Sequence, residues 1–195
     1  LINGDTTTST LLLENGVVDI NALGDRPFRN AIWSENIECV TLLLNHGANV
    51  HVNNDFPLIL AVERNLTSIV SVLLQHGANV HARDDYALRE ATTRGNEDIV
   101  RILLQHGANV HARGDLALRE AVYRESIPVI QTLLVHGADV HVVERELLLV
   151  AHNGQYANIV RSLLEHGGNP KSFGISNALI AAAEYGREEI VRILL

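Results

Sequence analysis

The fold is decided by residues 96–110, which read NEDIVRILLQHGANV. Asn96 is a suitable N-cap, and Glu97 and Asp98 follow it where the helix dipole favours negative charge. Apolar residues then recur at i, i+1, i+4 and i+5, the spacing of a single buried stripe. His106 closes the last turn, and Gly107 supplies the left-handed residue that commonly ends a helix. The stretch therefore predicts one short amphipathic helix.

The same pattern recurs along the chain. A His-Gly pair closes each copy, at 46–47, 76–77, 106–107, 136–137 and 166–167, a period of 30 residues. In the copy 81–110, we expect Asp85 to cap a first short helix with an apolar stripe of Ala87, Leu88 and Ala91, and Gly95 to end it. Neither helix is long enough to be stable alone, so the units are expected to stack.

A helix, a turn, a second helix and an extended connector resemble the ankyrin repeat family, whose second half residues 96–110 match almost throughout. The resemblance covers essentially the whole chain. It implies an all-α, ankyrin-type repeat solenoid of stacked helix-turn-helix units with short extended connectors. The family's usual unit has about 33 residues, and the shortfall lies in the hairpin finger, so we expect short fingers. Units containing Asp84 to Arg89 also resemble ankyrin arrays encoded by giant viruses of amoebae.

We expect a single solenoid over residues 1–195. Neither end offers the polar capping repeat that a self-contained solenoid needs, so further repeats are expected beyond both ends. Five full repeats are predicted at 21–50, 51–80, 81–110, 111–140 and 141–170, with partial repeats at 1–20 and 171–195.

Composition narrows the classes of partner. The chain has 15 Lys and Arg against 23 Asp and Glu, and its net charge of −8 argues against nucleic acid. No apolar run approaches the roughly 20 residues of a membrane helix, and the N-terminus has no secretion signal. A lone cysteine, Cys39, cannot form a disulfide framework. We therefore expect an intracellular, cytoplasmic monomer.

Nine of the ten histidines fall in two columns, the first at the five His-Gly pairs and the second at His51, His81, His111 and His141. Equivalent side chains on stacked helices lie roughly 8–10 Å apart, whereas zinc ligands must share one ion, so we expect no metal. The first column, at the His-Gly pairs, is interpreted as helix C-termini. In the family, the second column stands where an asparagine hydrogen-bonds neighbouring connectors and can be hydroxylated. Hydroxylation of His81 or His111 therefore stays open.

Motifs for catalysis are missing from the sequence. It has no Gly-x-Ser-x-Gly elbow, dinucleotide-binding loop, Walker loop or Cys-x-x-Cys pair. Cys39 aligns with a buried helical position, which favours a core thiol over a nucleophile. We expect neither an enzyme nor a cofactor.

Alanine recurs at one position of the repeat, at Ala31, Ala61, Ala91, Ala121, Ala151 and Ala182. The resemblance implies that residues just after this alanine column line a concave groove that binds another protein. Arg64, Arg94 and Arg124 would form a positive stripe between Trp33 and Tyr123, a composition favoured at hot spots. Arg binds carboxylates in bidentate fashion, so we expect a partner with an acidic surface. The candidate partner-binding residues are Trp33, Arg64, Arg94, Tyr123, Arg124 and Tyr185 in the groove, and Phe56, Tyr86 and Leu116 in the fingers.

Three alternatives remain at this point. The arginines can instead keep a helix face soluble by pairing with Glu63, Glu90 or Glu120 nearby. The chain can be the substrate-recruiting part of a larger adaptor or effector whose enzymatic or ligase-recruiting domain lies outside it. It can also be a structural spacer with no partner.

Overall fold

The computed structural model describes residues 19–143, 146, 156–168, 179–180 and 182–194. Every regular element in these residues is a helix, which confirms the predicted all-α class. The expected partial repeat at 1–20 lies almost wholly outside the described residues, as do parts of the repeats expected at 141–170 and 171–195.

The helices alternate along the chain between a first and a second helix of each pair. The first helices are α2 (Arg26–Trp33), α4 (Val52–Glu63), α6 (Ala82–Thr93) and α8 (Ala112–Tyr123), and the second helices are α3 (Ile37–Asn45), α5 (Thr67–Gln75), α7 (Glu97–Gln105) and α9 (Ile127–Val135). A short 3-10 helix η1 (Val140–Val143), α11 (Tyr156–Glu165) and α13 (Glu188–Leu194) follow.

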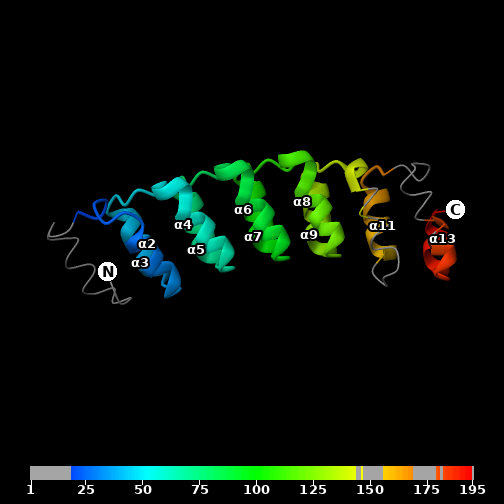
Figure 1. Cartoon of the computed structure of the whole chain (residues 1–195), viewed down its shortest axis with the longest axis horizontal. Helices are drawn as coiled ribbons and strands as arrows, with labels where there is room; N and C mark the ends of the chain where they lie inside the picture. The colour runs from blue at the N-terminus through cyan, green and yellow to red at the C-terminus, as the bar shows by residue number, and fades with distance from the viewer. Residues whose placement is uncertain (1–18, 144–145, 147–155, 169–178, 181, 195) are drawn as a thin grey trace.

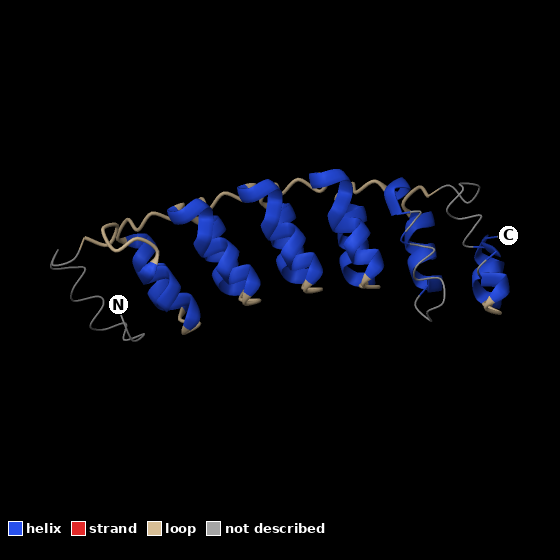
Figure 2. Ribbon diagram, in the orientation of Figure 1, coloured by secondary structure: helices blue, strands red, loops and turns tan. Residues whose placement is uncertain are grey.

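The helix pairs lie side by side in one row, with α2 at one end of the row and α13 at the other (Figure 1). First helices pack on first helices, as α6 does on α4 and α8, and second helices pack on second helices, as α7 does on α5 and α9. The connectors between pairs run along one edge of the row, and the tight turns within pairs lie along the other (Figure 2). The result is a two-layered solenoid.

The core lies between the two layers of helices. Leu88 of α6 and Leu103 of α7 are fully buried, and so are their equivalents in the neighbouring pairs. Each buried leucine contributes about 1.5–3 kcal/mol of hydrophobic free energy. The predicted apolar stripes in residues 81–110 are thus confirmed, and stacking rather than single helices supplies the stability.

Helix α7 begins and ends as predicted. The Asn96 side chain accepts a hydrogen bond from the Ile99 backbone N–H (2.9 Å), and Gly107 has a φ of +89°. The ring Nδ1 of His106 donates to the Ile102 carbonyl oxygen (2.9 Å), and the other His-Gly histidines of the described chain do the same one turn back. The first histidine column therefore satisfies carbonyls at helix C-termini.

The prediction that Asp85 caps the first helix is wrong. Residues 83–85 are all left-handed, with φ between +53° and +57°, and Asp85 makes no cap hydrogen bond. Its buried carboxylate instead accepts from the Asn109 backbone N–H of the next connector (2.7 Å) and from the His81 ring (3.0 Å). Asp55 and Asp115 do the same in their repeats.

This arrangement changes the role expected for the second histidine column. His81 lies 57% exposed and holds the aspartate of its own repeat, while the aspartate makes the bond to the neighbouring connector. The inter-connector hydrogen bond that the resemblance assigned to the histidine position is thus made by a residue four positions further on.

Candidate protein-binding surface

The exposed faces of α2, α4, α6 and α8 form one continuous layer, called here the first-helix surface. Trp33 and Tyr123 are the last residues of α2 and α8, and each is 57% exposed. Tyr185, in the turn before α13, is 58% exposed. The structure therefore leaves all three aromatic residues predicted for the groove accessible from solvent.

The three arginines predicted to form a free positive stripe are paired with acids. Arg94 Nε lies 2.7 Å from Glu90 Oε1, and Arg124 Nε lies 2.6 Å from Glu120 Oε1. Such i,i+4 pairs on a helix are common and weak, and they neutralise both charges. The interpretation that these arginines keep a helix face soluble therefore fits Arg94 and Arg124.

Arg64 has a different environment. Its guanidinium stacks 4.2 Å from the centre of the Trp33 ring and pairs with Glu35 of the preceding repeat (3.0 Å). Glu63, which the sequence offered as a partner for arginine, instead accepts a hydrogen bond from the Tyr86 hydroxyl (3.2 Å). Arg64 thus orients an exposed tryptophan rather than presenting a free charge.

Phe56, Tyr86 and Leu116 were expected in the fingers, but the structure places them in helices α4, α6 and α8. Each follows directly after the three left-handed residues that open its helix. All three are half-buried, and Arg29 lies 4.7 Å from the centre of the Phe56 ring. They belong to the first-helix surface, in the spaces between neighbouring pairs.

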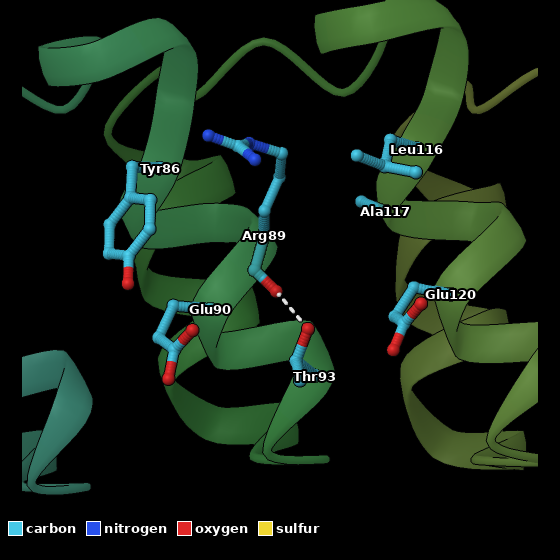
Figure 3. Close-up of a pocket in the computed structure, with 7 residues that line it drawn as sticks. All are labelled: Tyr86, Arg89, Glu90, Thr93, Leu116, Ala117 and Glu120. Carbon is cyan, nitrogen blue, oxygen red and sulfur yellow. Dashed lines mark hydrogen bonds between the residues drawn. The ribbon is translucent and has the colours of Figure 1, made fainter.

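A hollow of about 160 Å³ opens between α6 and α8 on this surface (Figure 3). Tyr86 and Arg89 lie on the α6 side, and Leu116 and Ala117 face them from α8. Its remaining lining residues are Glu90, Thr93 and Glu120. The hollow brings together two of the predicted residues, Tyr86 and Leu116, with an arginine that the sequence analysis did not single out.

Arg89 differs from the arginines predicted for the site. One terminal nitrogen donates to the Arg83 carbonyl oxygen (3.3 Å), and its guanidinium lies 5.4 Å from the centre of the Tyr86 ring. Its buried Nε–H has no hydrogen-bond acceptor, and no carboxylate of the described residues forms an ion pair with it. Arg89 is a cation in the hollow with unused donors.

The Tyr86 hydroxyl is held in its protonated form. Desolvation by burial raises its pKa, and the nearby carboxylates of Glu90 and Glu63 raise it further. A protonated phenol can donate to Glu63, which fixes the ring as one wall of the hollow.

Within the part of the chain that the structure describes, no group of three or more His, Cys, Asp or Glu side chains could hold a metal ion. In the same residues, none of the helices combines the length and apolar character needed to cross a membrane.

A second, shallower hollow lies between α7 and α9, beside Val135, which is 72% exposed.

Paired helices stacked in a row define a helical repeat solenoid, and comparison with known families shows which kind. The model of ankyrin repeats in three copies matches residues 58–144 and 118–195, and the model of the single ankyrin repeat matches residues 27–55. The chain belongs to the ankyrin repeat family. Ankyrin repeats are generally protein-protein interaction modules and typically lack enzymatic activity.

Solved structures agree with this assignment. The ankyrin repeat domain of Bcl-3, a member of the IkappaB protein family, is 30% identical, with a TM-score of 0.69 over 88% of this chain and 85% of that one. A domain from Acinetobacter baumannii AYE is 24% identical (TM-score 0.74, 87% and 96% covered). The human ASB11 domain is also 24% identical (TM-score 0.70, 97% and 93% covered). No curated protein matches the sequence.

Proposed function

We propose that this chain binds a partner protein through the first-helix surface, which corresponds to the concave groove of the family. The observation that carries the proposal is the exposure of Trp33 and Tyr123 on this surface. Burying a large aromatic side chain in an interface releases hydrophobic free energy that is not gained while the side chain is exposed to water. Trp and Tyr are also enriched at interaction hot spots. The hollow beside Tyr86 adds a concave feature into which a partner side chain can fit.

Site-specific photo-crosslinking tests the location of the interface. A photoreactive phenylalanine analogue replaces Tyr123 on the first-helix surface or, as the matched control, Val135 on the second-helix layer, where it is 72% exposed. In an extract of the cells that naturally express the chain, we expect a discrete covalent partner from position 123 and none from position 135. The reverse result would place the interface on the second helices.

The partner identified in this way is then purified and its affinity measured. Trp33→Ala and Tyr123→Ala should each weaken binding by about tenfold or more, as hot-spot truncations do. Val135→Ala should leave the affinity unchanged. Unaltered melting curves would show that the variants remain folded, because all three side chains are mostly exposed.

A further inference from the structure

The lack of an acid beside Arg89 follows from the way neighbouring repeats face each other. In the next repeat, the equivalent residue Arg119 pairs with Glu146, which comes from the repeat after it (2.8 Å). The position equivalent to Glu146, one repeat of 30 residues earlier, holds Leu116. Leu116 lines the hollow opposite Arg89, so an apolar side chain stands where the other repeat supplies a carboxylate.

Arg89 also lacks a partner on its own helix. Arg29 pairs with Asp25, four residues earlier. The equivalent residue before Arg89 is Asp85, whose carboxylate already accepts from the Asn109 amide and the His81 ring. Neither arrangement used by the equivalent arginines is open to Arg89. A partly buried guanidinium that has no ion-pair partner, and whose Nε–H has no acceptor, is unfavourable in free energy. A bound carboxylate would supply both the opposite charge and the acceptor.

We infer that the hollow between α6 and α8 receives an acidic side chain of the protein partner, with its carboxylate on Arg89 and its aliphatic stem against Leu116 and Ala117. The inference rests on the proposed function and adds the chemistry of one contact. Arg binds carboxylates through parallel hydrogen bonds, and Tyr86 supports the guanidinium from its face.

The size and charge of the hollow agree with this occupant. Its volume of about 160 Å³ is below the roughly 300–1,000 Å³ of ordinary small-molecule sites and suits a single side chain. Glu90 and Glu120 line it, but each is paired with an arginine of its own helix. Their charges are therefore neutralised locally, and Arg89 remains the uncompensated charge among the residues lining the hollow.

Two pools of phage-displayed peptides test the inference without knowledge of the natural partner. Both have random flanks around one fixed residue, which is Glu in the first pool and Gln in the second. The pools are compared on the immobilised wild-type chain, on Arg89→Gln, and on Arg101→Gln as the control. Arg101→Gln removes the same charge from α7, in the second-helix layer.

We expect the wild-type chain to recover the Glu pool about tenfold better than the Gln pool, the scale of one charge-assisted contact. The ratio should fall to about one on Arg89→Gln and stay high on Arg101→Gln. Leu116→Glu provides a second variant, because it reproduces the pairing of Arg119 with Glu146 inside the hollow. It should abolish the Glu preference while leaving the melting temperature at or above that of the wild type.

Equal recovery of the two pools on the wild-type chain would overturn the inference, as would a Glu preference that survives in Arg89→Gln. If peptides bind without a Glu preference but lose binding with Trp33→Ala and Tyr123→Ala, the acidic contact fails and the proposed surface stands. If peptides bind without a Glu preference and binding is also unaffected by those two changes, both proposals fail.

Discussion

Thr92 places a polar hydroxyl among buried apolar side chains. In residues 21–140 its column otherwise holds Ile32, Val62 and Val122, and these four side chains are completely buried. Within the described residues, the Thr92 hydroxyl has no hydrogen-bond partner. A buried hydroxyl without a partner costs about 1–3 kcal/mol. This position therefore lowers the stability of the solenoid.

We predict that Thr92→Val raises the free energy of unfolding by about 1–2 kcal/mol, because valine has nearly the same shape and needs no hydrogen bond. Urea unfolding measures the change. Thr93→Val is the control, since the Thr93 hydroxyl donates to the Arg89 carbonyl oxygen (3.0 Å) and is partly exposed. A gain at position 93 as large as that at position 92 would contradict the explanation.

Between elements, the aspartate column fastens each connector to the next. Asp85→Ala would leave the Asn109 N–H without its acceptor, and we predict a loss of about 1–3 kcal/mol of unfolding free energy. Asp84→Ala is the neighbouring control: Asp84 has a side chain 72% exposed and forms only a surface pair with Arg113, worth about 0–1 kcal/mol. Similar urea midpoints for the two variants would argue against the buried bond.

Helix α7 was predictable from the sequence because its start and stop signals are local. The Asn96 side chain accepts a hydrogen bond from the amide three residues on, and Gly107 takes its left-handed conformation two residues after the last residue of α7. The beginnings of the first helices were not predictable in the same way. The partner of Asp85 lies 24 residues away, and Arg83 carries no sequence signature of the left-handed conformation that it adopts.

The candidate site likewise has a part that could be predicted from the sequence and a part that depends on contacts between repeats. Exposure of Trp33 and Tyr123 followed from their place in the repeat, whereas the partners of the arginines depend on which side chains face each other across repeats. Comparing columns could have found Arg89, since the position that holds Glu146 opposite Arg119 holds Leu116 one repeat earlier, opposite Arg89. That comparison becomes meaningful only once the structure shows that positions 119 and 146 meet in space.

At the scale of the whole molecule, each helix pair packs on the neighbouring pairs. A substitution in one pair should therefore destabilise the nearest pairs more than distant ones. Leu103 is fully buried in α7, which packs on α5, α6 and α9. We predict that Leu103→Ala costs about 2–5 kcal/mol of unfolding free energy. In hydrogen exchange, α5 to α9 should lose more protection than α2 and α3.

Val135→Ala is the control for this experiment, because that side chain is largely in solvent and its removal should leave exchange unchanged. A uniform loss of protection over all described helices in Leu103→Ala would show that the chain unfolds as one cooperative block instead.

The aspartate bonds also bear on how a gene for such a chain can change length. Asp55 binds the amide of Asn79, Asp85 that of Asn109 and Asp115 that of Asp139, always across 24 residues. If recombination between two copies removed residues 61–90, Asp55 would be followed at the same distance by the matching amide of Asn109. Unequal crossing-over can thus add or delete whole units in frame, and each new junction inherits a working interface.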